Sequence, residues 1–480
     1  MRGVAAVPFG VLARIAPALL CLVACAKPAA EVKPPAAPVP ATPAPATPAT
    51  PPAARLDIPV KQLTLDNGLR VVLSPDTTTP VAVIAVYYNI GFRIEPRDRT
   101  GFAHLFEHMM FQGSQNLGKM EFIKMVQSNG GVLNGSTRFD FTNYFEIVPA
   151  NTLETMLWGE ADRMRGLAVT QANLTNQQGV VKSEVRVNVL NQPYGGFPWL
   201  DMPQYANQNW HNAHNFYGDL ADLDHATLAD VKKFFQQYYV PNNAVLVIAG
   251  DFAYDTAERW VHQYFDAIPR GPDTARPDLT EPRQDKEIRA EKVDKLADRP
   301  ALAVAYHAPE RMTPEFFAFI LLHEILLDGH DSALFQKLVQ DKKLTGDVTG
   351  GLNLLGNPYD YAGPMLWMAS AIHDRDKPAD QLIAAIDEAI EPLRKAPVSA
   401  AVLARARVKA RANLYGMIDQ AFGFGRADLL AAFALSDHDA TRINQLEGEL
   451  EKVTPAQIQK TAQDYLRSTN RTVLQLKPGK

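Results

Sequence analysis

Residues 104–111 read HLFEHMMF and place two histidines, His104 and His108, four positions apart with Glu107 between them. Side chains three and four positions apart share one face of a helix, so both imidazoles can reach a single ion. Catalytic zinc takes three protein ligands and keeps one position open, and a neighbouring carboxylate can move a proton from water to a leaving amine. The segment therefore indicates either a zinc peptidase site or a buried histidine pair with an incidental carboxylate.

A third ligand decides between these two interpretations, and the chain offers Glu184. This residue lies in GVVKSEVRVN, residues 179–188. The segment is predicted to be helical because its apolar residues recur at helical spacing. A glutamate on such a helix is available as an oxygen ligand to zinc. The apolar face is formed by Val180, Val181, Val185 and Val189.

The segments around the motif alternate between strand and helix patterns. Asn67-Gly68 is a hairpin turn signal between apolar runs, and the continuous apolar run VAVIAVYY at 81–88 is typical of a strand buried on both faces. We expect strands within 63–91, 130–148 and 244–252, and helices at 102–111, 119–129, 151–167, 175–191 and 227–239.

The same order of elements recurs after a polar, proline-rich segment at 271–287, which we interpret as a linker between two domains, 57–270 and 288–480. ILLHEILLDG at 320–329 aligns with HLFEHMMFQG at 104–113, so the repeat is domain-sized, with a period of roughly 220 residues. In this alignment the second copy has lost the metal-binding constellation, because its counterparts of His104, Glu107 and His108 are Ile320, His323 and Glu324. The second copy is predicted to have strands at 301–309 and 471–478 and helices at 316–329, 334–343, 378–393, 401–418 and 454–466.

The first 56 residues have the composition of a targeting segment and a tether. Residues 1–25 combine an early arginine with a short apolar run, as in a secretory signal, and end in LVAC, which resembles the lipobox of bacterial lipoproteins. That resemblance implies a lipid on Cys25, which would anchor the protein to a membrane facing the periplasm. Ala26 after this cysteine resembles the sorting pattern for the outer membrane. The alternatives are a soluble periplasmic or a secreted protein. Residues 26–56 are rich in proline and alanine, so we expect an extended linker.

Composition excludes some classes of protein. Cys21 and Cys25 are the two cysteines, so no disulfide is expected in the mature domains, and stability must come from the core. The net charge of −5 offers no basic surface for nucleic acid.

The chain is similar to the pitrilysin-type M16 (inverzincin) zinc metallopeptidases, in particular to the two-domain branch of bacterial processing-type peptidases. The order H-x-x-E-H is the inverzincin signature. Glu184 stands 76 residues after His108, where the family has its third ligand. Three further segments carry the resemblance, which covers about 57 to 480: GGVLNGSTRFDFTNYF at 130–145, EADRM at 160–164 and YYVPNNAVLVIAGDF at 238–252.

This resemblance implies an α+β fold of duplicated domains, each a mixed sheet packed against helices. It implies one zinc ion per chain, held by His104, His108 and Glu184, with Glu107 as the general base and then the acid of a metalloendopeptidase. Peptide substrates would bind as an added strand, through main-chain hydrogen bonds. The edge strand implied for this role contains Asn134, Gly135, Ser136 and Thr137.

Two positions depart from the family pattern. Gln177 stands where a second glutamate often supports the site, which changes the local charge but leaves a group able to orient a ligand. Val339 and Gly346 stand where active members have an arginine and a tyrosine that stabilise the oxyanion, and the spacing of Lys342 and Lys343 does not replace them.

We therefore expect the zinc-bearing subunit of a heterodimer, whose second M16-like subunit supplies the Arg/Tyr pair, or else a homodimer. The alternative is a non-catalytic assembly or binding subunit with the same fold, tethered to a membrane.

Overall fold

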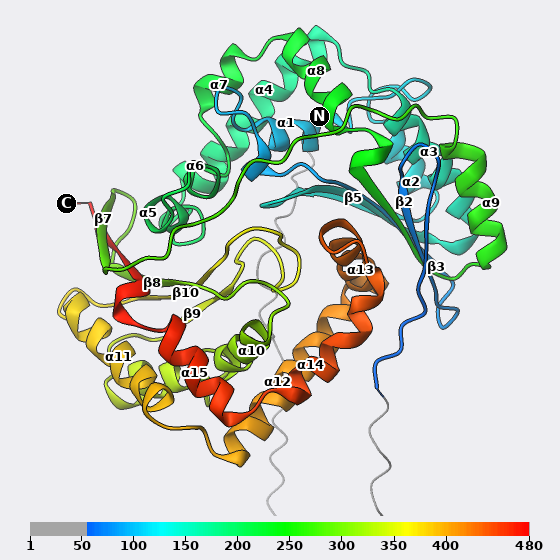
Figure 1. The fold of residues 1–480 in the computed structure, drawn as a ribbon. Helices are drawn as coiled ribbons and strands as arrows, with labels where there is room; N and C mark the ends of the chain where they lie inside the picture. The colour runs from blue at the N-terminus through cyan, green and yellow to red at the C-terminus, as the bar shows by residue number, and fades with distance from the viewer. Residues whose placement is uncertain (1–54, 480) are drawn as a thin grey trace, which may run out of the picture. The chain divides into compact units, whose positions relative to one another are not determined.

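The computed structural model describes residues 55–479 (Figure 1). The predicted signal segment, with the proposed lipidation site Cys25, and residues 26–54 of the predicted tether lie outside the described residues. Within residues 55–479, no helix is both long enough and apolar enough to cross a bilayer.

The first half of the chain contains a six-stranded mixed sheet. Its order is β1-β2-β6-β3-β5-β4, in which β2 and β6 are parallel and the other neighbours are antiparallel. The Asn67-Gly68 signal is confirmed as part of the turn between β1 and β2, where Gly68 has a φ of +90°. The strands are β1 (Lys61–Thr64), β2 (Arg70–Pro75), β3 (Val81–Tyr88), β4 (Val132–Thr137), β5 (Thr142–Pro149) and β6 (Ala244–Gly250).

Strand β3 is buried on both faces, as its continuous apolar sequence predicts. Its even-numbered residues, Ala82 to Tyr88, pack in the core beneath the helices of the first half, and its odd-numbered residues, Val83 to Tyr87, pack in a second core. The first of these cores is shared with α1 (Phe102–Met109), α2 (Glu121–Ser128), α3 (Leu153–Arg165), α4 (Gln171–Val185), α7 (Leu220–His225), α8 (Leu228–Tyr238) and α9 (Tyr254–Phe265).

The second half repeats this architecture. Its sheet has the order β7-β11-β8-β10-β9, with β7 and β11 parallel and the remaining neighbours antiparallel, so it matches β2-β6-β3-β5-β4. The predicted duplication and the α+β class are confirmed. The strands are β7 (Ile288–Asp294), β8 (Ala301–His307), β9 (Thr349–Leu352), β10 (Leu366–Ile372) and β11 (Arg471–Pro478). The helices are α10 (Pro314–Leu326), α11 (Ala379–Lys395), α12 (Ala400–Ile418), α13 (Phe424–Ser436), α14 (Leu446–Lys452) and α15 (Pro455–Tyr465).

The second half covers the free face of the first sheet with α13. Asp428 of this helix accepts a hydrogen bond from the Tyr87 hydroxyl at 2.5 Å, and Arg426 donates to the carboxylate of Asp76 at 2.9 Å. Apolar residues of α13 and of the first sheet lie in one continuous core. The first sheet is therefore buried only when the second half is present.

The first half in turn covers the second sheet with α5 (Met202–Ala206), which is followed by α6 (Trp210–Ala213). Met202 and Ala206 pack against Ala303 and Leu474 of that sheet. Lys292 of β7 donates to the Asp201 carboxylate just before α5, at 2.7 Å. Each half thus covers the sheet of the other half with one helix, so the hydrophobic core of each half is complete only when the other half is present.

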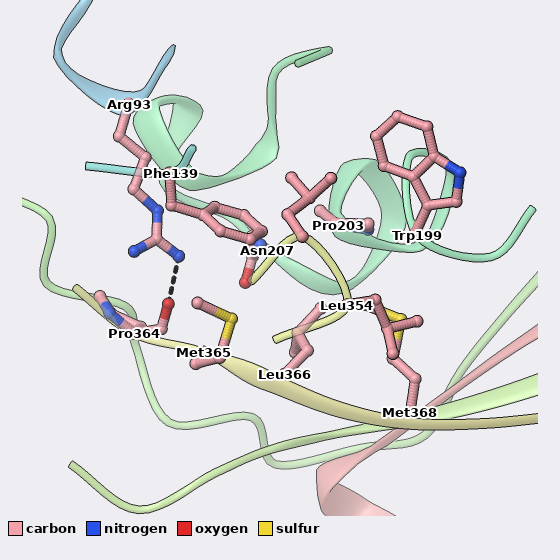
Figure 2. Close-up of a pocket in the computed structure, with 11 residues that line it drawn as sticks. Arg93, Phe139, Trp199, Pro203, Asn207, Leu354, Pro364, Met365, Leu366 and Met368 are labelled. Atoms are coloured by element: carbon pink, nitrogen blue, oxygen red, sulfur yellow. Dashed lines mark hydrogen bonds between the residues drawn. The ribbon is translucent and has the colours of Figure 1, made fainter. Parts of the chain in front are cut away.

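Arg93 connects the two halves near their junction. It is 1% exposed, pairs with Asp140 at 3.3 Å and donates to the carbonyl oxygen of Pro364 in the second half (Figure 2). The residues around it, among them Phe139 and Trp199, enclose a cavity of about 10 Å³. This volume holds about one water molecule, so the junction is closely packed.

The segment between the halves contains neither helix nor strand from the end of α9 to the start of β7. It is bound to the first half, because the Glu281 carboxylate accepts from the backbone N–H groups of Gln208 and Asn209. The domain boundaries at 57–270, 271–287 and 288–480 stay predictions.

Three local expectations differ from the structure. Helix α4 begins four residues before the predicted start, because the Thr170 side chain accepts from the backbone N–H of Asn173 and caps the helix. The last part of that predicted helix is a π-helical turn, Arg186–Leu190. Val180, expected on the apolar face, is 42% exposed.

Candidate metal centre

Helix α1 carries the HLFEH motif, and a buried carboxylate fixes its N-terminus. Glu95 is 1% exposed and accepts hydrogen bonds from the backbone N–H groups of Gly101 at 2.9 Å and Ala103 at 2.5 Å. These N–H groups have no partner within the helix, and negative charge is favourable at this end. Gly101 has a φ of +80°, and a Cβ at this position would lie 2.7 Å from the Tyr217 carbonyl oxygen, so only glycine fits.

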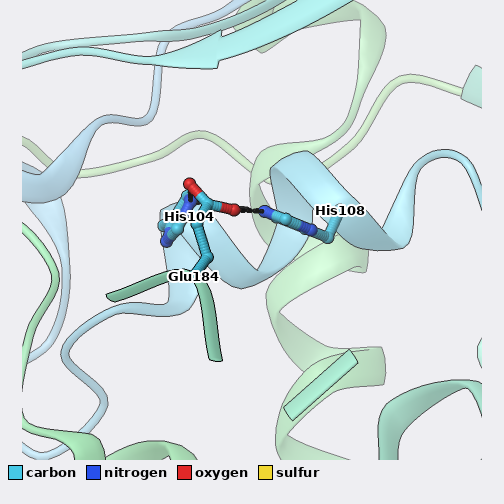
Figure 3. A group of neighbouring side chains, drawn as sticks. All are labelled: His104, His108 and Glu184. Carbon is cyan, nitrogen blue, oxygen red and sulfur yellow. Dashed lines mark hydrogen bonds and ion pairs between the residues drawn. The ribbon is translucent and has the colours of Figure 1, made fainter. Parts of the chain in front are cut away.

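The two histidines of α1 face a glutamate from α4. The Nε2 atoms of His104 and His108 lie 3.3 Å apart. Glu184 places one carboxylate oxygen 3.5 Å from His104 Nε2 and the other 3.1 Å from His108 Nε2 (Figure 3). The structure therefore brings together the three residues that the sequence predicts as ligands.

The spacing of these atoms fits a tetrahedral zinc ion. Zinc bonds to imidazole and carboxylate are about 2.0–2.2 Å long, so tetrahedral angles place the ligand atoms about 3.3–3.6 Å apart. The two Nε2 atoms are 3.3 Å apart. The Glu184 oxygens, one facing each histidine, lie 3.5 Å from His104 Nε2 and 3.1 Å from His108 Nε2, close to these values. Among residues 55–479, this is also the one group of three or more His, Cys, Asp or Glu residues whose ligand atoms all lie within 4.8 Å of one another.

The charge of the group also suits a divalent cation. Burial opposes ionisation of Glu184, but its hydrogen bonds with His104 and His108 outweigh burial and lower the pKa of the carboxyl well below its ordinary value. Glu184 is therefore ionised at neutral pH, which is the form that binds a metal. Two imidazoles and one carboxylate form a donor set found in catalytic zinc sites.

Glu107 lies beside this group and is held by a neighbouring strand. Its Oε2 atom accepts a hydrogen bond from the Thr137 hydroxyl at 2.7 Å. The side chain is partly exposed, so it can reach a water molecule in the site. A carboxylate in this position can accept a proton from that water and return it to a leaving group.

The four residues predicted to contact a peptide lie on β4, which ends the first sheet. Asn134 is exposed and Ser136 is half-buried, whereas Gly135 and Thr137 are buried. The Ser136 hydroxyl donates to the Asn143 side chain at 2.5 Å. The Thr137 side chain points at Glu107, and the contact of these four residues with a peptide stays a prediction.

Gln177 lies on α4, two turns before Glu184, and is 4% exposed. No hydrogen bond joins its side chain to His104, His108 or Glu184 in the described part of the chain. Its predicted supporting role stays a prediction.

Two aromatic residues that the sequence analysis did not identify, Phe216 and Tyr217, pack against His104. The Tyr217 ring lies edge-on to the His104 ring, with centroids 5.1 Å apart, and Phe216 lies 6.2 Å from the same ring. Burial, followed by the charges of Glu184 and Glu107, raises the pKa of Tyr217, so its hydroxyl stays protonated. These residues lie in 192–226, where the sequence shows no clear period.

The corresponding place in the second half has hydrogen bonds in place of metal ligands. Asn413 of α12 donates to both oxygens of Glu324, at 3.1 and 3.2 Å, and His323 accepts from the Trp367 indole N–H at 3.1 Å. Burial lowers the pKa of His323 to about 4. Burial and the Asp328 charge raise the pKa of Glu324 to about 8. A neutral acid and an amide at this point do not form a zinc site.

Comparisons with known proteins agree with this fold. A family model described as insulinase (peptidase family M16) matches residues 70–212, and one described as the peptidase M16 inactive domain matches residues 225–409. The zinc protease PqqE of Helicobacter pylori is 26% identical over 426 residues, which are 87% of this chain and 93% of that protein.

Two solved structures are similar over the same length. A protease from Helicobacter pylori superimposes with a TM-score of 0.79 at 26% identity, over 88% of this chain and 100% of that one. A peptidase M16 inactive domain from Pseudomonas fluorescens shares the fold, with a TM-score of 0.75 at 17% identity, over 88% of this chain and 98% of that one. The chain therefore belongs to peptidase family M16, with an N-terminal and a C-terminal domain of that family.

Proposed function

We propose that this protein is a zinc-dependent metalloendopeptidase that hydrolyses peptides or unfolded protein segments. The observation that carries the proposal is the convergence of His104, His108 and Glu184 at zinc-ligand spacing, with the charge of Glu107 acting on His104. The name of the Helicobacter pylori relative, a zinc protease, supports the same chemistry.

Each residue of the site would have a defined task. A zinc ion held by His104, His108 and Glu184 would polarise the scissile carbonyl and lower the pKa of the attacking water. Glu107 accepts the proton of that water and delivers it to the leaving amine. The free edge of β4 offers main-chain hydrogen bonds to an extended peptide, which would give binding with little sequence preference.

The proposal about a partner starts from the two positions of the second half where the family resemblance implies an arginine and a tyrosine. Val339 is half-buried and Gly346 is exposed with open space around it. Lys342 is paired with Glu388, so it is not free to replace the missing arginine. We propose that a second M16-like subunit, or a second copy of this chain, donates such a pair. Activity of the pure monomeric chain equal to that of the complete mixture would contradict this.

We further propose that the protein is periplasmic and held at a membrane, in the outer membrane by preference, through a lipid on Cys25. The support is the LVAC sequence and the proline-rich segment after it. A soluble periplasmic or secreted protein is the alternative, and mass spectrometry of the mature N-terminus distinguishes them.

Cleavage of an unstructured peptide tests the function. The wild-type chain, supplied with its partner where one is required, should cleave the peptide, lose activity to a chelator and regain it with zinc. Glu107→Gln should retain zinc and lose cleavage by about 100-fold or more, which is the usual contribution of a general base. Equal behaviour of wild type and Glu107→Gln would instead indicate a non-catalytic binding subunit.

A further inference from the structure

We propose that Thr137 is a positioning residue that holds the Glu107 carboxylate in place for proton transfer. The inference rests on the proposed peptidase function and adds a residue that acts through the base. Its basis is the 2.7 Å hydrogen bond from the Thr137 hydroxyl to Glu107 Oε2. A base must lie within hydrogen-bond reach of the proton that it abstracts, so its orientation limits the rate.

Glu107 has few other constraints. Within residues 55–479, the bond from Thr137 is the one hydrogen bond that its carboxylate makes, and the side chain is partly exposed. A glutamate side chain has three rotatable bonds and loses considerable rotamer freedom when it is ordered. Because Thr137 occupies Oε2, the other oxygen remains available to accept a proton.

Thr137 is itself rigid. It is 2% exposed and ends β4, directly opposite Thr142 of β5. A threonine on a strand has a restricted χ1 angle, so the ladder of β4 and β5 fixes the position of its hydroxyl. The base on a helix is therefore held by a side chain from a neighbouring strand.

The burial of Thr137 argues against direct contact of its side chain with substrate. Its hydroxyl points inward to α1, whereas the exposed side chains of the strand are those of Val132 and Asn134. Among the described strands, β4 is paired on one side only, so a peptide that adds to its free edge would lie along the strand that carries Thr137. Main-chain hydrogen bonds to such a peptide would leave the Thr137 hydroxyl free to hold Glu107.

Three variants separate this role from a structural one. Thr137→Val keeps the shape and removes the hydroxyl, and Thr137→Ser restores a hydroxyl. Thr142→Val is the matched control, because it removes a buried hydroxyl from the opposite residue, where it donates to the Ile90 carbonyl at 2.8 Å. All three are measured for zinc content, thermal midpoint, kcat and KM, with the partner subunit present where activity requires it.

We expect Thr137→Val to bind one zinc per chain and to lower kcat by about tenfold or more, with KM changed by less than about twofold. Thr137→Ser should recover most of kcat, and Thr142→Val should lower the thermal midpoint without lowering kcat. A Thr137→Val enzyme with wild-type kcat would overturn the proposal. A change mainly in KM would also overturn it, because that result would assign Thr137 to substrate binding.

Crystal structures of the zinc-loaded variants decide the positioning role even if the chain cleaves no peptide. The Glu107 carboxylate should occupy one orientation in wild type and Thr137→Ser and leave it in Thr137→Val. An unmoved Glu107 in Thr137→Val would refute the proposal. The wild-type chain could lack peptidase activity while its Glu107 is ordered and leaves that orientation in Thr137→Val. That result would refute the proposed function and leave the positioning role of Thr137 intact.

Discussion

His108 Nε2 lies 3.1 Å from Glu184 Oε2, although the two residues are 76 positions apart in the sequence. Helix α4 brings the carboxylate to the face of α1 that carries both histidines. The contact depends on an ionised carboxylate, which the low pKa of Glu184 provides.

Glu184→Gln should therefore weaken zinc binding strongly. Gln keeps the size of the side chain but loses the charge, and loss of a direct ligand should exceed the roughly 10–100-fold cost of losing an outer-shell partner. Competition with a chelator measures the affinity. Glu107→Gln is the control, because it removes the neighbouring carboxylate without removing a ligand. Equal zinc affinity of Glu184→Gln and wild type would be inconsistent with this site.

Glu95→Ala should loosen the start of α1. The change removes the acceptor of the Gly101 and Ala103 N–H groups, and loss of a helix cap costs about 0.5–2 kcal/mol. We expect a lower thermal midpoint, weaker zinc binding and faster amide exchange in 101–105. Glu121→Ala is a matched control, since Glu121 accepts from the Gly118 N–H at 2.7 Å in an exposed position. Similar exchange in the two variants would rule out a special role for Glu95.

Glu324 should make the protein less stable as the pH rises. Burial and the Asp328 charge raise its pKa to about 8 in the folded protein, above the ordinary value of about 4.3. The folded state then holds a proton that the unfolded state has lost, so this contribution to stability is complete below about pH 4 and disappears as the pH rises through 8.

Glu324→Gln removes this titration and leaves a carbonyl oxygen that can accept from Asn413. Urea unfolding at pH 5 and pH 9 should show that the stability of the variant relative to wild type increases at the higher pH. A difference that is the same at both pH values would show that Glu324 does not titrate in this range.

Because α5 covers the second sheet and α13 covers the first, we expect that neither half folds alone. Residues 55–270 by themselves would expose the sheet face that α13 covers, and residues 271–480 would expose the face that α5 covers. Large apolar surfaces of this kind promote aggregation. Size-exclusion chromatography and circular dichroism should show unfolded or aggregated halves when each is expressed singly, and one folded complex when they are expressed together. A monomeric, cooperatively folded first half would contradict the shared core.

Much of the site could be predicted because its central part is local. The i, i+4 spacing of His104 and His108 fixes two ligand positions on any helix. Glu184 could be chosen only through the family resemblance, because nothing in its own segment indicates that its helix packs against the helix of the two histidines. The contact between Thr137 and Glu107 depends on the face of β4 that meets α1, and the sequence leaves that face undetermined.

The fold was predictable to a similar extent. The continuous apolar strand β3, the turn at Asn67-Gly68 and the repeat of elements are properties of single segments or of their order. Helix α9 was missed, although Ala257, Val261 and Phe265 recur at a helical period and are buried. The packing of α5 and α13 on the sheet of the opposite half is a tertiary arrangement, and the sequence of a helix carries no signal for the sheet that it covers.

The central claim is that His104, His108 and Glu184 hold a zinc ion, and diffraction at the zinc absorption edge tests it most directly. We expect one anomalous peak per chain within about 2.0–2.2 Å of both imidazole Nε2 atoms and a Glu184 oxygen. Zinc-supplemented crystals without a peak at this position, or with a peak held by other residues, would contradict it.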